Sequence, residues 1–561
     1  MAKIKQLIEC VPNFSEGRDM NVINQITDEI RNSAGVRLLD VDPGEATNRT
    51  VVTFVGEPEA VMEAAFRAVR KASQLIDMRQ HHGAHPRSGA TDVLPLVPVA
   101  GITLEECAEL ARKLAKRLAD ELEIPCYCYE AAALKPERKN LAVVRRGEYE
   151  AIPERINDPA EAPDFGARPF DEGVARTGCT NVGARDFLIA VNYNLNTTST
   201  RRANAIAFDV REKGRPAREG NPITGKVKLD ENGKKIMIPG TLKGTKGIGW
   251  YIEEYGIAQV SMNITNINVT PLHVAFDEVC RCAQNRGVRV TGTEIVGLVP
   301  ERTLLEAGRY FLEKQQRSTG IPKEDIINIA IKSLGLSDLK PFNPREKVIE
   351  YLLEDENGDD KALVKMTVKG FAEETSRESP APGGGSVAAY MGALGAALGT
   401  MVANLSSHKP GWDDRWEEFS RWADKGQALS DELLVLVDED TRAFNKIMEA
   451  FGLPKKTDED KRLRSEAIQA ATLFATQVPL QTMQAAFGAF ELCQAMAEFG
   501  NPNSVSDAGV GALAARAAVL GAGLNVKINA ASLKDREAAD KMIAEAEQLI
   551  AEAQKKEAEI I

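Results

Sequence analysis

The stretch EDENGDDK at residues 354–361 decides the fold, because the character of the chain changes on either side of it. It combines a run of charges with a glycine, which is typical of a linker. Before it, short apolar runs alternate with helical patterns, whereas residues 362–561 are rich in Ala, Glu, Leu and Gln and show long helical periodicity. The sequence therefore predicts a multidomain protein that ends in an acidic linker at 354–361 and an all-α helical domain at 362–561.

Upstream of the linker, short apolar runs mark strands and longer amphipathic runs mark helices. Val36–Val41 and Thr50–Val55 are typical of strands, and Pro58–Gln74 is typical of an amphipathic helix. Thr91–Val99 is a further apolar run, but its two prolines favour an edge strand or a loop. Alternating strands and helices predict layered α/β structure.

The next part of the chain continues in the same style. Phe187–Val191 and Ala258–Asn263 are predicted strands, and the Asn232-Gly233 pair between alternating runs predicts a β-hairpin. We therefore predict two α/β (α+β sandwich-like) subdomains, at residues 1–187 and 188–353.

One uncharged stretch beyond the linker, Ser386–Leu405 (SVAAYMGALGAALGTMVANL), is long enough to span a bilayer. Its residues are mostly Ala and Gly, and the large apolar residues that favour membrane insertion are few. Because small residues also let helices approach closely, a buried helix of a soluble bundle is the favoured interpretation. Helical patterns cover Val387–Leu405, Trp416–Phe451, Asp458–Gly500, Ser506–Leu524 and Lys534–Ile561.

Composition limits the partners and the compartment. The 561 residues carry 70 Lys and Arg against 82 Asp and Glu, a net charge of −12. This balance argues against a surface that binds nucleic acid or an anionic membrane, so an anionic ligand requires local cations. The 8 cysteines are irregularly spaced and too few to crosslink a chain of this size. Because the first residues also lack the apolar run of a signal peptide, we expect a cytoplasmic protein.

Three of the 5 histidines lie in one short motif, HHGAHPR at residues 81–87. His81 and His85 have the i, i+4 spacing of helical zinc ligands, but the glycine and proline between and after them disfavour a helix. A neutral imidazole in a loop suits a general base, and Arg87 beside it suits carboxylate binding. The residues alone also leave a plain surface loop open.

Other motifs that suggest a metal or a nucleotide are weak. Cys126-Tyr-Cys128 and Cys280-Arg-Cys282 are spaced too closely for the usual zinc pattern. Gly509–Ala514 (GVGALA) has the shape of a dinucleotide-binding turn, but it lies in a helical region without a preceding strand. Ordinary structural positions are favoured for all three.

Three glycine-containing segments are candidates for anion binding. Gly166–Gly178 (GARPFDEGVARTG) and Gly240–Gly249 (GTLKGTKGIG) are predicted loops with exposed backbone amides, arginines and lysines. Pro380–Ser386 (PAPGGGS) leads into a helix and places free N–H groups and Ser386 where a carboxylate can bind. Each segment alone is also compatible with a flexible loop.

An acidic residue, Asp440, interrupts the apolar face of the helix predicted at 416–451. A carboxylate on a core-facing stripe is costly unless it is paired or functional, and desolvation raises its pKa toward neutrality. A functional acid and a structural aspartate paired with Arg or Lys are equally compatible with the pattern. The stripe consists of Leu433, Leu436, Val437, Phe444, Ile447, Met448 and Phe451.

Long motifs resemble two known enzyme families. Five segments of the first 254 residues resemble the glutamate formiminotransferase family. They are 10–19 (CVPNFSEGRD), 38–56, 83–93 (GAHPRSGATDV), 183–195 (GARDFLIAVNYNL) and 247–254 (GIGWYIEE). Two later segments, 380–402 and 437–451 (VDEDTRAFNKIMEAF), resemble the cyclodeaminase family. In this order and over nearly its whole length, the chain resembles the bifunctional formimidoyltransferase-cyclodeaminase family.

This resemblance implies a bifunctional folate enzyme of histidine degradation. The transferase half would move the formimino group from N-formimino-L-glutamate to N5 of polyglutamylated tetrahydrofolate. The cyclodeaminase half would then close 5-formimino-tetrahydrofolate to 5,10-methenyl-tetrahydrofolate and release ammonia. The resemblance also implies a ring-shaped homo-octamer or another homo-oligomer, and we expect no metal, no nucleic-acid partner and no membrane span.

The resemblance places the family's functional residues on this sequence. The transferase base falls on His85, and the cyclodeaminase residue falls on Asp440. The first folate-binding segment contributes Gly166, Ala167, Arg168, Pro169, Phe170, Arg176 and Gly178. The second contributes Gly240, Thr241, Leu242, Lys243, Gly244, Thr245, Lys246, Gly247, Ile248 and Gly249. Relative to the family pattern, residues 219–239 are an insertion before this second segment.

Two alternative functions concern the C-terminal half. A methenyl-tetrahydrofolate cyclohydrolase is the first, because that activity occurs on the same helical fold in the family. A structural assembly domain is the second. Asp440 disfavours it, because a scaffold gains nothing from a carboxylate on its core-facing stripe.

Overall fold

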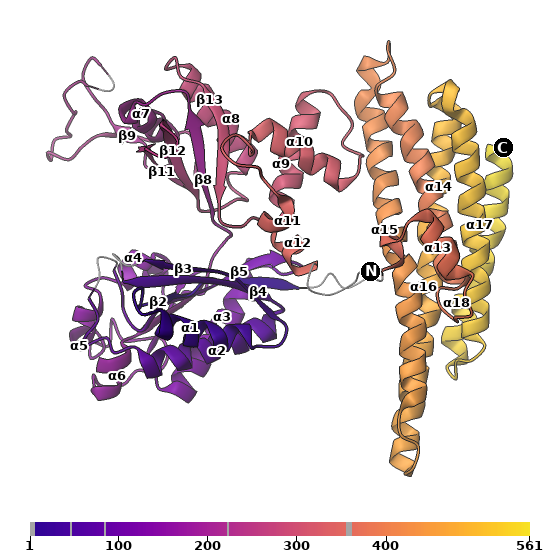
Figure 1. The fold of residues 1–561 in the computed structure, drawn as a ribbon, viewed down its shortest axis with the longest axis horizontal. Helices are drawn as coiled ribbons and strands as arrows, with labels where there is room; N and C mark the ends of the chain where they lie inside the picture. Colours follow the sequence, from indigo (N-terminus) through magenta and orange to yellow (C-terminus); the bar gives the residue numbers. More distant parts are fainter. Residues whose placement is uncertain (1–5, 45–47, 83–85, 222–223, 355–361) are drawn as a thin grey trace. The chain divides into compact units, whose positions relative to one another are not determined.

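The computed structural model describes residues 6–44, 48–82, 86–221, 224–354 and 362–561 (Figure 1). The chain forms two compact units, Met1–Pro300 and Glu301–Ile561. The first contains two large β-sheets with helices packed on them and a separate two-stranded sheet, and the described part of the second is helical. The predicted fold class, two α/β subdomains followed by an all-α domain, is confirmed. The predicted domain boundaries remain predictions, and residues 355–361 of the predicted linker lie outside the described residues.

The sheet of the N-terminal subdomain has seven strands and mixed pairing. Strand β4 pairs antiparallel with β1, β2 and β3, and β5 pairs antiparallel with β1 and β2 but parallel with β7. Strand β6 pairs parallel with β7. The strands are β1 (Leu7–Cys10), β2 (Asn13–Phe14), β3 (Val36–Gly44), β4 (Arg49–Gly56), β5 (Thr91–Ala100), β6 (Cys126–Glu130) and β7 (Thr180–Ala184).

Three long helices form the core of this subdomain with one face of the sheet. Alternate strand residues such as Ile8 and Cys10 are buried in that core, so Glu9 between them faces the other side of the sheet. The long helices are α1 (Met20–Arg31), α2 (Pro58–Leu75) and α3 (Leu104–Leu122). The short ones are η1 (Pro136–Lys139), α4 (Leu141–Val144), η2 (Tyr149–Ala151), α5 (Ile152–Arg155) and α6 (Glu172–Thr177).

Strand β5 corrects one expectation. Its prolines favoured an edge strand or a loop, yet β5 lies inside the sheet between β2 and β7. The carbonyl of Pro95 still accepts a hydrogen bond from the Val11 N–H at 3.3 Å. Near Pro98, the register of β1 against β5 shifts by a bulge. Prolines are therefore tolerated here because one keeps its acceptor and the other lies beside an irregularity.

The second sheet is fully antiparallel and has the order β11-β12-β8-β13. The predicted hairpin is confirmed, since β9 pairs antiparallel with β10 and Leu229 bridges to Lys235 across the Asn232-Gly233 turn. The strands are β8 (Ile189–Leu195), β9 (Arg215–Pro216), β10 (Met237–Ile238), β11 (Thr245–Ile252), β12 (Ile257–Ile264) and β13 (Val290–Val296). The helices are α7 (Thr200–Val210) and α8 (Leu272–Gln284).

The second unit is dominated by five long helices, α14 to α18, which are orange to yellow in Figure 1. The predicted C-terminal helices are confirmed. The long helices are α14 (Gly384–Ser407), α15 (Trp416–Gly452), α16 (Asp458–Phe499), α17 (Val505–Ala530) and α18 (Arg536–Ile560). The others are α9 (Glu301–Lys314), α10 (Lys323–Leu334), α11 (Pro344–Lys347), α12 (Ile349–Glu354), η4 (Leu363–Lys365), α13 (Val368–Thr375), η5 (Asp413–Arg415) and η6 (Pro502–Ser504).

The glycines of α14 let neighbouring helices approach closely. A Cβ atom on Gly395 would lie 2.9 Å from the Gly511 carbonyl oxygen, and one on Gly399 would lie 2.7 Å from Leu492. Two helical segments, Gly384–Ser407 and Pro502–Ala530, are long and apolar enough to cross a membrane, and 61% and 44% of their most apolar windows are buried within the protein. Burial in a bundle accounts for the composition of α14.

Candidate active sites

The catalytic candidate His85 lies outside the described residues, but the described flanks of its motif are firmly held. His81 Nε2 lies 2.8 Å from the Asn48 carbonyl oxygen, and Arg87 Nε donates to His81 Nδ1 at 3.3 Å. A carbonyl only accepts, so Nε2 carries the proton and Nδ1 is the acceptor. Burial lowers the pKa of His81. His81 is therefore a neutral structural histidine in a single tautomer.

Arg87 is occupied by carboxylates of the chain itself. Its two terminal nitrogens donate to both carboxylate oxygens of Glu150, at 2.8 and 2.6 Å, and Nη1 also donates to Glu148 at 3.1 Å. These contacts, the Glu150 hydrogen bonds most of all, raise the pKa of Arg87. The predicted bidentate carboxylate partner is thus internal, and Arg87 fixes the segment that follows His85.

A buried polar cluster follows this segment and was missed by the sequence analysis. Asp92 is 1% exposed and accepts hydrogen bonds from the Ser88 N–H at 2.9 Å and from Arg145. Burial raises the pKa of Asp92 to about 6, and Arg145 opposes that shift. Four buried atoms around it have no hydrogen-bond partner among the described residues: Ser88 Oγ, Thr91 Oγ1, Asn181 Oδ1 and Arg145 Nε. Buried polar atoms are rarely left unpaired, so these atoms indicate a ligand-binding or water-filled site.

Glu9 is a second buried acid that the sequence analysis missed. It lies on the face of the first sheet opposite α1 to α3 and is 5% exposed. Burial raises the pKa of Glu9 to about 7, although Arg185 pulls it down. A carboxyl that titrates near neutrality can exchange protons with a substrate. The sequence signal was its place in the otherwise apolar strand LIEC.

The first predicted folate segment, Gly166–Gly178, is not one loop. Asp171 caps helix α6 by accepting from the Val174 N–H at 3.0 Å, so Arg176 lies in a helix. Arg168 pairs with Glu123 at 2.7 Å and with Asp171. The predicted role of Arg168 in folate binding stays a prediction, and a folate would have to compete with these two carboxylates for its guanidinium group. Gly166 and Ala167 are exposed, Pro169 is exposed, and Phe170 is half-buried.

Gly178 has a structural reason to be glycine. Its φ is +65°, and a Cβ atom there would lie 2.3 Å from the Ser88 carbonyl oxygen. The close approach holds the end of the first predicted folate segment against the residues that follow His85 in the chain. It links this segment to the Asp92 cluster.

The second predicted segment, Gly240–Gly249, is half strand. Thr245–Gly249 belong to β11 and pair with β12, so the predicted loop is wrong there. Glycines at alternate positions face α7, where a Cβ on Gly249 would lie 2.1 Å from the Asn204 backbone nitrogen. They serve helix–sheet packing. Lys243 and Lys246 are exposed, as are Thr241 and Ile248, whereas Leu242 is buried and Gly244 is half-buried.

The sheet face opposite α7 carries a polar network that the sequence analysis did not identify. Trp250 Nε1 donates to Gln259 Oε1 at 3.0 Å, and Gln259 Nε2 donates to Asn194 Oδ1 at 2.8 Å. Asn192 Nδ2 donates to Glu294 Oε2 at 3.0 Å. A satisfied polar network fixes side-chain positions. The signal was the period-two polar pattern of VNYNL and AQVSMN.

In the helical unit, Asp440 on α15 faces the N-terminus of α14. Its Oδ2 accepts from the Ser386 N–H at 2.9 Å and from Ser386 Oγ at 3.1 Å. A Cβ on Gly385 would lie 2.1 Å from Asp440 Oδ1, so this approach requires glycine. The sequence predicted a carboxylate-binding site at Ser386 and a functional acid at Asp440. The structure brings the two together, and Asp440 is the carboxylate.

The surroundings of Asp440 favour a functional acid over a structural ion pair. Burial raises its pKa, and the hydrogen bonds from Ser386 oppose that shift. Among the described residues, no ion pair involves Asp440, so the structure gives no sign of the structural Arg or Lys partner. The predicted apolar stripe holds at Leu436 and Val437, but Met448 and Phe451 are about half exposed. The fully buried residues of the stripe all precede Asp440 in α15.

No group of three or more His, Cys, Asp or Glu side chains is placed to hold a metal ion within the described ranges. The cysteines of both close pairs are free thiols. Burial raises the pKa of Cys128 to about 12, which makes it unreactive at neutral pH.

Family models match three consecutive parts of the chain. They are described as "Formiminotransferase domain, N-terminal subdomain" at residues 7–185, "Formiminotransferase domain" at 190–354 and "Formiminotransferase-cyclodeaminase" at 367–548. A formimidoyltransferase-cyclodeaminase of Mus musculus is 43% identical over 532 residues, which cover 95% of this chain and 94% of the mouse protein. The chain belongs to the formimidoyltransferase-cyclodeaminase family. It is a bifunctional enzyme that joins a formimidoyltransferase to a cyclodeaminase.

Relatives of each half also exist as separate proteins. A glutamate formimidoyltransferase of Streptococcus pyogenes is 40% identical over 313 residues, covering 56% of this chain and 94% of that protein. A methenyltetrahydrofolate cyclohydrolase of Methylorubrum extorquens is 40% identical over 187 residues, covering 33% of this chain and 90% of that protein.

Proposed function

We propose that the chain transfers the formimino group of N-formimino-L-glutamate to N5 of tetrahydrofolate, as a step of histidine degradation. It then closes the product to 5,10-methenyl-tetrahydrofolate and releases ammonia. The observation that carries this proposal is Asp440. It is held by Ser386 and has no ion pair among the described residues, in a chain whose two halves resemble the two activities in sequence.

In the transfer step, N5 attacks the formimino carbon and the amino nitrogen of glutamate leaves. We assign the base that removes the N5 proton to His85, supported by the resemblance of residues 83–93. A positioned base contributes about 10²–10⁴ in rate. His85→Ala should lower formimino transfer by that factor and leave ammonia release from supplied 5-formimino-tetrahydrofolate unchanged. If His85→Ala transferred the formimino group at the wild-type rate, His85 would not be the base.

In the cyclisation step, N10 attacks the formimino carbon and ammonia departs once its nitrogen is protonated. Asp440 takes the N10 proton and returns it to the leaving nitrogen, which its raised pKa favours. The relative named as a cyclohydrolase makes hydrolysis of methenyl-tetrahydrofolate the second candidate for this half. Ammonia release with appearance of methenyl-folate absorbance supports the first; hydrolysis without ammonia release supports the second.

The folate co-substrate is polyglutamylated in this proposal, neither activity uses a metal, and the protein is cytoplasmic without a membrane span. Activities that persist after dialysis against a chelator would support the absence of a metal. Extraction with the soluble fraction of disrupted cells would support the compartment.

The enzyme assembles as a homo-oligomer, with the octamer as the proposed form. Large apolar side chains remain exposed on the long helices, which supports burial against further copies. Light scattering of the purified chain measures the mass directly, and a monomer at micromolar concentration would contradict this part. The exposed residues are Leu394, Leu405, Leu513, Leu524 and Ile528.

A further inference from the structure

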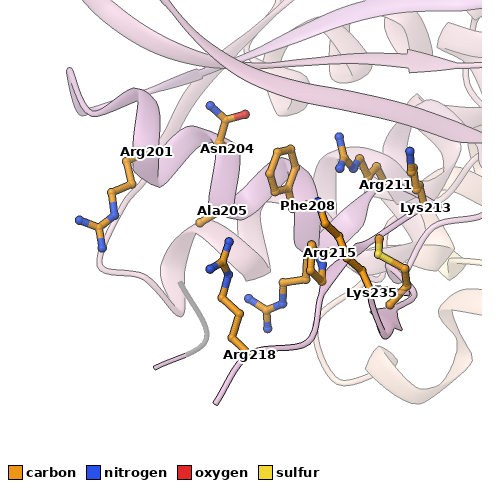
Figure 2. Close-up of a pocket in the computed structure, with 11 residues that line it drawn as sticks. Arg201, Asn204, Ala205, Phe208, Arg211, Lys213, Arg215, Arg218 and Lys235 are labelled. Atoms are coloured by element: carbon orange, nitrogen blue, oxygen red, sulfur yellow. The ribbon is translucent and has the colours of Figure 1, made fainter. Parts of the chain in front are cut away.

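A basic groove of about 640 Å³ runs between α7 and the hairpin segments that follow it (Figure 2). Six of its lining residues are cationic and, among the described residues that line it, none is acidic. Phe208, Ala205, Pro216 and Met237 form its apolar part. The cations are Arg201, Arg211, Lys213, Arg215, Arg218 and Lys235.

Three of these arginines are held by the protein. Arg211 donates to the Gly214 and Gly247 carbonyls at 3.1 and 3.0 Å and lies over the Phe208 ring at 3.8 Å. Arg218 donates to the Gly225 carbonyl at 2.7 Å, and Arg215 pairs with Asp209 at 2.9 Å. Fixed guanidinium groups bind an anion with little loss of side-chain freedom.

The charge of the groove is not balanced within the protein. Arg215 has an ion pair, but the described ion pairs include none for Arg201, Lys213 or Lys235. The chain as a whole has a net charge of −12, so this cluster of positive charges is a local exception. Because the like charges surround one cavity, they repel one another. An anionic ligand would relieve that repulsion.

The spread of the cations indicates the shape of that ligand. Arg201 and Arg211 are ten residues apart along one helix and its end, which corresponds to about 15 Å. In Figure 2 the two side chains lie toward opposite ends of the lining residues, so we do not expect one phosphate or carboxylate to reach both. An extended molecule with several anionic groups can, and its uncharged parts would contact Phe208 and Met237.

We propose that this groove binds an extended small polyanion. Two sources share this chemistry: the oligoglutamyl tail of a folate and a free linear polyphosphate. For the first source the inference rests on the proposed folate function, whereas binding of a free polyanion does not depend on it. The groove lies on the α7 side of the second sheet, away from the Trp250–Gln259 network on its other face.

The test uses the full chain with Arg201, Lys213 and Lys235 each changed to Gln. The matched control changes Lys226, Lys228 and Lys234 to Gln, which are exposed on the same hairpin outside the groove lining and remove the same charge. Binding of tetraglutamate and of tripolyphosphate is measured by calorimetry. We expect the groove variant to bind at least about tenfold more weakly, because charge-assisted hydrogen bonds are lost, and the control to bind like wild type.

Enzyme kinetics then identify the source. For a folate tail, the groove variant raises KM for tetraglutamyl-tetrahydrofolate and leaves KM for the monoglutamyl form unchanged. For a free polyphosphate, both KM values stay unchanged while tripolyphosphate binding is lost. Wild-type protein that binds neither probe, or equal loss of binding in the control, overturns the proposal. Failure of folate turnover with retained polyanion binding would instead count against the proposed function alone.

Discussion

Each unit contains an aspartate whose pKa is raised by burial, and the hydrogen-bonding partners of the two aspartates differ. Asp92 in the first unit is 1% exposed and pairs with Arg145. Asp440 in the second unit is partly buried, and among the described residues its carboxylate accepts hydrogen bonds from the N–H and hydroxyl of Ser386 and pairs with no cation. Burial is the largest cause of the pKa shift at both positions.

The difference separates a structural carboxylate from one that can exchange protons. A carboxylate against a guanidinium leaves a buried cation unpaired whenever it is protonated, so its charge is tied to the fold. A carboxylate held by neutral donors can gain a proton without leaving a charge behind. Asp92 therefore orders the cluster after His85, and Asp440 is suited to acid–base chemistry.

Among the variants, Asp440→Asn should have the largest effect on enzymatic activity. The variant loses the group that moves the proton and should release ammonia about 10²–10⁴ times more slowly. Formimino transfer should be unchanged, so 5-formimino-tetrahydrofolate accumulates. Single-turnover assays with absorbance detection of the methenyl product measure both steps. Normal ammonia release would place the proton transfer elsewhere.

The thermal stability of Asp440→Asn tests independently whether Asp440 has a structural role. A folded-state pKa above the unfolded value of Asp means that stability is greatest at low pH and is lost as pH rises from about 4 through the folded pKa. Ionised Asp440 therefore costs stability at neutral pH. Asp440→Asn keeps an acceptor for the Ser386 N–H, so its melting temperature at pH 7 should equal or exceed that of wild type. A clear drop would indicate a structural role instead.

Asp92→Asn should show the opposite pattern. The change leaves Arg145 without its carboxylate, at a position where the arginine side chain is 15% exposed. An unpaired buried charge costs about 3 kcal/mol or more, which should lower the melting temperature of the first unit and reduce transfer. The double variant Asp92→Asn with Arg145→Met removes both charges and should recover much of the stability. Additive losses in the double variant would contradict the pairing argument.

The sequence predicted Asp440 because helical periodicity places it on a core-facing stripe, and it predicted the carboxylate site at Ser386 from a glycine-rich helix start. It did not predict that these are one site, because their contact joins residues 54 positions apart. The segment Thr245–Gly249 was expected to be a loop. Its glycines are explained by the close packing of α7, which no local pattern reveals. The ion pair between Arg168 and Glu123 likewise joins residues distant in sequence, so no local pattern predicts it.

Ser386→Ala tests whether the Ser386 hydroxyl sets the pKa of Asp440 in the helical unit. It removes the hydroxyl donor to Asp440 and keeps the backbone N–H, and since both donors lower the pKa of Asp440, the change should raise it. The acid limb of the pH–rate profile for ammonia release should move to higher pH, and the rate at neutral pH should fall by about tenfold or less. Thr441→Val is the control, because Thr441 Oγ1 lies 3.3 Å from Ser386 Oγ and does not contact Asp440 in the described hydrogen bonds. An unshifted profile in Ser386→Ala would show that the hydroxyl does not tune the acid.

The smallest effect is expected from exposed cations of the first unit, where water screens each charge. Lys243 and Lys246 are exposed beside and within β11, whereas Arg168 already has two carboxylate partners. Exposed ion contacts contribute about 0.2–1 kcal/mol, so Lys243→Ala with Lys246→Ala should raise KM for tetrahydrofolate by about twofold to fivefold. The increase should occur for monoglutamyl and tetraglutamyl forms alike, and it should shrink as salt is added, because exposed charges are screened. Arg168→Gln should change KM less, since its charge is neutralised within the protein before the folate arrives. An equal or larger effect of Arg168→Gln would mean that its pairing with Glu123 and Asp171 gives way to the ligand, and the first glycine-rich segment would then be the stronger anion site.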